Sequence, residues 1–148
     1  MKEIGRYTTR GRVPHLKEFR INLFDGRFDT AYRVVSFQIA PYDFSAAADS
    51  TALGRLATDN GLPLLREKFW DFSDNTQIGW ASINGEGFEA YPQAHQTIID
   101  PENLVVEDLF ITCLNGDDNE TNYQLELIKY DISEWQGALG IVRNESQG

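Results

Sequence analysis

The residue types that most often carry chemistry are few and widely separated in this chain of 148 residues. The two histidines, His15 and His95, lie far apart in the chain, and the single cysteine is Cys113. Zinc sites need three or four nitrogen, sulfur or carboxylate ligands, and the spacings HxxxH, CxxC and HExxH are absent. The nucleophile elbow GxSxG is absent as well. We therefore expect no catalytic residues, no metal site and no cofactor, and we interpret the protein as not an enzyme.

Two groups of acidic residues could form sites. Residues 115–120 hold three acids beside Asn and Gly, and their oxygens could bind calcium. The segment departs from an EF-hand loop because the glycine at the sixth position is missing, and Asn-Gly with Asp is also typical of a hairpin turn, so both interpretations stay open. Glu107 and Asp108 adjoin in an expected strand, so they point to opposite faces and cannot act as a paired acid and base.

The charge is distributed unevenly along the chain. The net charge is −10, yet segment 1–20 holds six cations and two anions, so it carries +4 and segment 21–148 carries −14. Such asymmetry is typical of an arm that meets an anionic partner. The expected arm is residues 1–17, and the cations expected to act with it are Lys2, Arg6, Arg10, Arg12, Lys17 and Arg20. The acidic remainder disfavours nucleic-acid binding, so we expect any such contact through this segment only.

Strand patterns dominate the chain after residue 17. Alternating apolar residues and the turn at Asp25-Gly26 predict a hairpin over residues 18–40. Residues 45–58 are rich in helix formers and predict a short helix. Further strands are predicted at 64–70, 76–83 and near 97–99.

The last third of the chain predicts a long ribbon and a helix. Residues 104–114 and 121–132 form two strand patterns joined by the polar turn at 115–120, which predicts a second hairpin. Ser133 and Gln136 match a capping box, which predicts a helix over 134–144. Trp135, Leu139 and Val142 form its apolar stripe, which we interpret as a subunit interface.

These elements predict a mainly β fold, an antiparallel β-sandwich or jelly roll with one or two short helices including the C-terminal one. We expect a single sandwich domain over residues 18–148 behind the arm. No run of about 18 apolar residues occurs, so no membrane span is expected. The N-terminus lacks the apolar stretch of a secretory signal, which favours synthesis in a cytoplasm.

Aromatic residues make up 12% of the chain. They fill a core or an interface in a structural domain, whereas in a sugar-binding module some of them form an exposed stacking platform. Trp70 and Trp80 are the candidates for such a platform.

The chain resembles structural proteins of small viruses, including bacterial viruses, in two stretches. These are residues 75–81 and the C-terminal stretch from Asp100-Pro101-Glu102 through Asp108-Leu109-Phe110-Ile111 and Lys129-Tyr130 to Trp135-Gln136-Gly137-Ala138-Leu139. The resemblance is one of texture, namely a strand pair before a terminal helix, with a basic leader in front. It implies a jelly-roll capsid protein, and the acidity of the chain departs from that class.

The resulting hypothesis is a non-enzymatic structural subunit of a virus particle. It would be a self-associating capsid protein made in the host cytoplasm, with copies of itself and other virion proteins as partners. The alternative is a carbohydrate- or ligand-binding β-sandwich module, such as a fibre or accessory domain.

Overall fold

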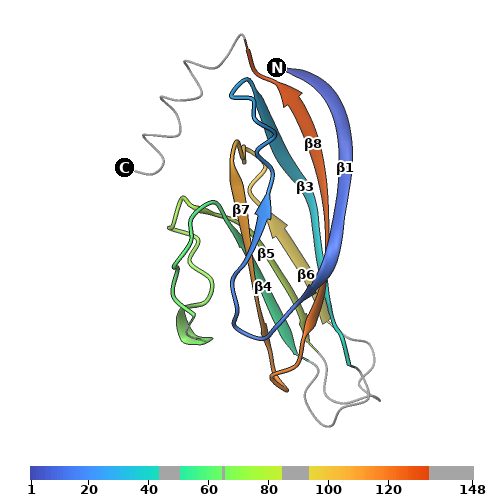
Figure 1. Cartoon of the computed structure of the whole chain (residues 1–148). Coiled ribbons are helices and arrows are strands. Elements are labelled where there is room, and N and C mark those ends of the chain that lie inside the picture. The colour runs from blue at the N-terminus through green and yellow to red at the C-terminus, as the bar shows by residue number, and fades with distance from the viewer. Residues whose placement is uncertain (44–50, 65, 85–93, 134–148) are drawn as a thin grey trace.

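The computed structural model describes residues 1–43, 51–64, 66–84 and 94–133, and these form two antiparallel sheets packed face to face (Figure 1). Sheet A has the strand order β1-β8-β3, and sheet B has the order β2-β7-β4-β5-β6. The strands of sheet A are β1 (Lys2–Val13), β3 (Thr30–Pro41) and β8 (Thr121–Asp131). Those of sheet B are β2 (Phe19–Asn22), β4 (Ala52–Ala57), β5 (Gln77–Asn84), β6 (Ala94–Ile99) and β7 (Asp108–Asn115). The predicted mainly β sandwich is confirmed.

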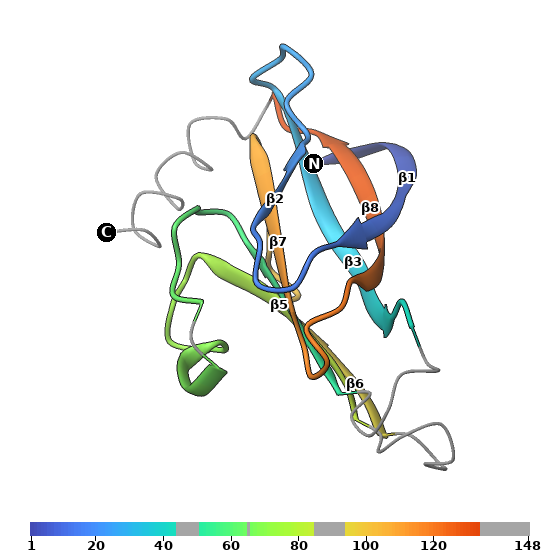
Figure 2. The same ribbon diagram turned by 60° about the horizontal axis from the view of Figure 1, so that its bottom comes forward.

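The strand order is that of an antiparallel sandwich that matches a jelly roll in three of its four strand pairs. β4 pairs with β5, β2 pairs with β7, and β1 pairs with β8. Each of these pairs encloses the previous one in the sequence, as in a long hairpin that is folded into two layers. β6 lies against β3 and extends sheet B beyond β5. Figure 2 shows the two layers from the end, with β1, β8 and β3 beside β2 and β7.

Alternating side chains of β8 illustrate why this layer forms. Tyr123, Leu125 and Leu127 are buried, whereas Gln124 and Glu126 are exposed on the opposite face. The buried set packs on Phe37 and Ile39 of β3 and on Leu109, Ile111 and Cys113 of β7, which together fill the space between the sheets. Sheet A therefore has an apolar inner face and a polar outer face, as the period of two requires.

Both predicted hairpins contain the right strands but the wrong pairing. β2 bonds to β7 and β3 bonds to β8, so the chain crosses between sheets after Asp25-Gly26 instead of turning back. The turn at 115–120 likewise leads from β7 in sheet B to β8 in sheet A. Alternation records which face of a strand is buried and says nothing about which strand lies beside it.

Two local predictions are wrong for a physical reason. Residues 52–57, expected in a helix, form the central strand β4, because it gains two strand neighbours and burial on both faces, which outweighs the helix propensity of Ala and Leu. Residues 64–70, expected as a strand, contain the short 3-10 helix η1 (Arg66–Lys68). The strands expected at 76–83 and near 97–99 are confirmed as β5 and β6.

The predicted free arm is also wrong, because residues 2–13 are the edge strand β1. They pair with β8 from Lys2 opposite Asp131 to Val13 opposite Thr121, and Val13 is fully buried. Most of the remaining side chains of β1 are exposed, which is why its sequence shows no apolar alternation. The start of β1 and the end of β8 consequently lie at the same pole of the sandwich (Figure 1).

The outer face of sheet B is covered by the connection from β4 to β5. Its Phe69 is 1% exposed and lies over the guanidinium of Arg55, which is 4.6 Å from the ring centre. Nη1 of Arg55 donates to the carbonyls of Pro63 and Phe69 at 2.7 and 3.0 Å. Burial lowers the pKa of Arg55, and the carbonyl acceptors take the place of a carboxylate partner. No helix among the described residues is long and apolar enough to cross a membrane.

Candidate functional site

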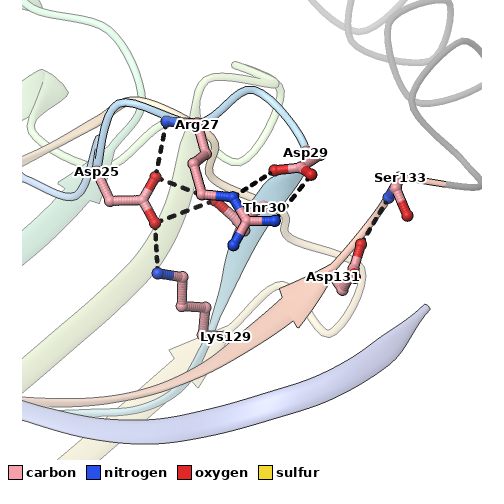
Figure 3. A network of polar contacts seen from close by, with 7 residues as sticks. All are labelled: Asp25, Arg27, Asp29, Thr30, Lys129, Asp131 and Ser133. Atoms are coloured by element: carbon pink, nitrogen blue, oxygen red, sulfur yellow. Dashed lines mark hydrogen bonds and ion pairs between the residues drawn. The ribbon is translucent and has the colours of Figure 1, made fainter.

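A network of charged side chains lies at the pole where β8 ends, and Figure 3 shows it. Asp25 accepts hydrogen bonds from Nζ of Lys129, from the backbone N–H of Arg27 at 3.0 Å and from the Thr30 hydroxyl at 3.3 Å. Arg27 forms a two-pronged ion pair with Asp29, at 2.9 and 2.8 Å. The group ties the β2–β3 connection to β8.

The protonation of this network is shifted towards the charged forms. The hydrogen bond from Lys129 lowers the pKa of Asp25, and the reciprocal bond raises the pKa of Lys129. The Arg27 side chain likewise lowers the pKa of Asp29. The carboxylates thus have cations as partners, and among the described residues no group of three or more His, Cys, Asp and Glu is placed to hold a metal ion. We interpret the network as structural.

The acidic segment 115–120 forms a turn held by its own backbone. The N–H of Asp117 donates to Oδ1 of Asn115 at 2.9 Å, and Asp118 takes a positive φ of 59°. His15 accepts the N–H of Asn115 at its Nδ1 and places Nε2 3.1 Å from Oδ1 of Asp118. The contacts support the turn interpretation of this segment over a calcium loop.

The six cations expected to act together are divided by the fold. Lys2, Arg6, Arg10 and Arg12 lie on β1, Lys17 lies in the connection to β2, and Arg20 lies on β2. Arg20 forms an ion pair with Asp108 at 2.8 Å, and Arg6 forms one with Glu3 at 2.8 Å. Of the predicted set, only the four cations of β1 lie together on one strand.

Register places three of the β1 cations on the outer face of sheet A. Arg12 lies opposite Asn122 and Arg10 lies opposite Gln124, whereas Gly11 between them lies opposite the buried Tyr123. Residues that are directly opposite in an antiparallel pair share a face, so Arg10 and Arg12 point away from the core, and Arg6 follows the same alternation.

The outer face of sheet A is hollowed at the pole opposite the Asp25 network. The hollow, which we call the Arg10 groove, has a volume of about 640 Å³. Six of its lining side chains come from four strands: Arg10, Arg12, Gln38, His95, Asn122 and Gln124. A smaller hollow of about 210 Å³ lies further along the same face, between Arg6, Val35 and Glu126.

Arg12 is fixed at the end of the Arg10 groove. Its Nε lies 3.3 Å from Oε2 of Glu120, and its guanidinium lies 4.2 Å from the ring centre of Tyr42. Arg10 differs, because within the described part of the chain its guanidinium has no hydrogen bond and no ion pair. Sequence reasoning included Arg10 among the cations but missed Gln38, His95 and Gln124, which no spacing pattern connects to it.

Trp70 and Trp80 do not form the exposed aromatic platform that was expected. Trp80 is 6% exposed, and its indole N–H donates to Oε1 of Gln77 at 2.9 Å. Trp70 donates to the carbonyl of Gly54 at 3.1 Å and is partly buried. Phe72, which is 62% exposed, packs edge-on against Trp80 at 4.6 Å and covers it. The prediction that Trp80 offers a face to a ligand is therefore wrong.

The predicted helix at 134–144 and its interface stripe of Trp135, Leu139 and Val142 lie outside the described residues. Comparisons of this chain with protein-family models, with curated proteins and with solved structures found no match.

Proposed function

We propose that this chain is a non-enzymatic structural subunit of a virus particle, made in the host cytoplasm and assembled from copies of itself with other virion proteins. The β-sandwich, which shares three of the four strand pairs of a jelly roll, supports this proposal, because shells of small viruses are among the structures built from jelly-roll domains. Jelly rolls also serve as lectin domains, so the fold alone does not carry the proposal.

The observation that carries it is the free edge of β1. β1 is 12 residues long, it bonds to β8 on one side, and no strand of the described structure bonds to its other side. An unpaired edge of this length offers a row of backbone donors and acceptors to another chain. If the chain is a subunit of an assembly, a neighbouring subunit can bond to this edge.

Charge favours a second copy as the occupant of this edge. Segment 1–20 carries +4 and segment 21–148 carries −14, so β1 of one copy attracts the acidic surface of another. Two β1 strands would repel each other through their cations. The contact is therefore heterologous, and repetition of a heterologous contact generates rings, shells or filaments.

The experiment is light scattering of the purified chain at about 50 mM and about 500 mM salt. We expect a uniform species many times the 16.8 kDa monomer at low salt and a smaller one at high salt, because screening weakens contacts between exposed charges. The ratio of absorbance at 260 to 280 nm across each peak reports nucleic acid, whose contact we assign to the start of β1, around Lys2 and Arg6.

Arg6→Glu is the informative variant, and Lys68→Glu is its matched control. Both reverse one exposed cation, but Arg6 lies on the free edge strand and Lys68 lies in η1 over sheet B. We expect Arg6→Glu to reduce assembly and Lys68→Glu to leave it unchanged. A monomer at both salt concentrations, or equal effects of the two variants, would overturn the proposal.

A further inference from the structure

We propose that the Arg10 groove is a binding site for an acidic saccharide, that is, a chain of sugars in which some residues carry a carboxylate. This activity goes beyond assembly through β1 and rests on different atoms. The edge of β1 points away from β8, whereas the row of Arg10, Gln124 and Gln38 in the groove lies on the outer face of sheet A.

The floor of the groove is a row of three polar side chains. Gln124 of β8 lies opposite Arg10 of β1 on one side and opposite Gln38 of β3 on the other. All three share the outer face, are exposed, and form no side-chain hydrogen bond within the described residues. Neighbouring strands lie about 4.8 Å apart, so the row extends about 10 Å across the sheet.

The chemistry of this row matches hydroxyls beside a carboxylate. The guanidinium of Arg10 can donate two parallel hydrogen bonds to one carboxylate. Each carboxamide of Gln38 and Gln124 offers donors and an acceptor, which suits sugar hydroxyls because these also donate and accept. A row of about 10 Å spans roughly two sugar rings, and the open hollow of about 640 Å³ leaves room for a short saccharide lying on the sheet.

The same charges disfavour a nucleic acid in this groove. A nucleic-acid strand carries a phosphate about every 3.4 Å, and its binding depends on several unpaired cations. Here Arg12 is already paired with Glu120, and Arg10 is followed along the row by two uncharged side chains. Glu126 lies beside Gln124 on the same face, and the chain as a whole carries −10. A short acidic saccharide carries only a few carboxylates, so it brings fewer negative charges to the groove than a nucleic-acid strand and meets less of this repulsion.

Recognition in the groove is polar rather than aromatic. Tyr123 contributes to the lining, but it is 7% exposed and belongs to the core, where desolvation raises the pKa of its hydroxyl. Trp70 and Trp80 bond to residues of sheet B and do not line the groove. A neutral sugar would therefore lack both a stacking surface and a partner for Arg10.

The test is isothermal titration of the full chain with trigalacturonate, with maltotriose and a ten-nucleotide dT oligomer as comparison ligands. We expect trigalacturonate to bind and maltotriose to bind at least about tenfold more weakly, because a bond to a charged group is stronger than one between neutral groups. Amide NMR signals of Gln38 and Gln124 should shift with the same titration curve.

Arg10→Gln should weaken trigalacturonate binding about tenfold or more, whereas Lys68→Gln, which removes one charge outside the groove, should leave it unchanged. Gln38→Ala should weaken binding to a smaller extent. Absence of trigalacturonate binding, equal affinity in Arg10→Gln, or preference for the dT oligomer would each overturn the proposal. Because Arg6→Glu tests assembly and Arg10→Gln tests the groove, either proposal can fail alone.

Discussion

Gly54 shows how a single residue fixes the distance between the two sheets. It lies in β4, and a Cβ atom at this position would be 2.9 Å from the ring of Phe37 and 3.1 Å from Ile39, both in β3. The sequence pattern placed Gly54 inside the helix expected over residues 45–58. In the sandwich, the missing side chain is what allows the Phe37 ring to pack on β4.

Gly54→Val should therefore destabilise the protein. Inserting a branched side chain against Phe37 forces the sheets apart or moves the ring off its rotamer, at a cost of about 1–3 kcal/mol in the free energy of unfolding. Urea unfolding followed by tryptophan fluorescence measures the change. Thr8→Val on the exposed face of β1 is the control, with an expected change below about 0.5 kcal/mol. An equal midpoint for wild type and Gly54→Val would contradict the prediction.

The residues that line the Arg10 groove could not be predicted as a group from the sequence. Arg10, Gln38, His95 and Gln124 come from β1, β3, β6 and β8, and only strand pairing brings them together. Pairing between strands from opposite ends of the chain leaves no periodic signal in one sequence. The candidate cations on β1 were predicted, and their neighbours were not.

At the scale of elements, strands with a strong apolar or alternating pattern were predicted better than strands without one, and the two strands that were missed are β1 and β4. β5 has a strong apolar and aromatic pattern because it is buried on both sides, and β8 alternates because one of its faces is buried. β1 has neither pattern, since its Thr, Gly and Arg side chains are mostly exposed. Its stability as a strand comes from backbone bonds to β8, which depend on the partner rather than on its own composition.

Removing residues 1–13 should consequently disrupt the fold. The deletion exposes the edge of β8 and uncovers the core beside the fully buried Val13. We expect loss of the near-ultraviolet circular dichroism signal and of a cooperative thermal transition. The interpretation of this segment as an arm predicts the opposite, a truncated chain that melts like wild type.

The control for this deletion keeps the strand and removes its charge. Replacing Lys2, Arg6 and Arg10 by Gln leaves all backbone bonds to β8 in place. This variant should retain a cooperative transition, because exposed charges contribute little to stability. If it unfolds as extensively as the deletion, the charges of β1 rather than its pairing hold it in the sandwich.

A second edge is protected by a side chain. Asn103, which is 3% exposed, accepts the N–H of Val34 at 2.8 Å and donates to the carbonyl of Val34 at 3.0 Å. Tyr32 exchanges two backbone bonds of 2.8 Å with Val105 next to it. This part of β3 is thus satisfied without a full strand, whereas no described strand covers the outer side of β1, which is consistent with the proposal that assembly uses β1.

At the scale of the whole molecule, stability should fall in acid. The pKa values of Asp25, Asp29, Asp71 and Asp131 are lowered in the folded protein, through bonds from Lys129, from Arg27, and from Ser73 and Ser133 respectively. The unfolded chain, with ordinary values near 3.8, therefore binds more protons than the folded chain below about pH 4. The stabilisation from these groups is complete above that pH and is lost as the pH falls through their folded values.

Urea unfolding at pH 7, 5 and 3 measures this effect. We expect the contribution of these carboxylates to the free energy of unfolding to be the same at pH 7 and pH 5. At pH 3 we expect that contribution, and with it the free energy of unfolding, to be smaller. Asp25→Asn should be less stable than wild type at pH 7 and should lose less on acidification, because one of the four groups no longer titrates. A free energy of unfolding that is the same at pH 3 and pH 7 would contradict the prediction.

The pairing of Lys2 with Asp131 also determines how the protein can be oriented on a solid support. β1 starts at the pole of the Asp25 network and carries Arg10 and Arg12 near its other end, where the groove lies. A biotin or an affinity tag attached at Met1 therefore anchors the molecule by the pole remote from the groove. A sensor surface prepared in this way presents the groove to the analyte.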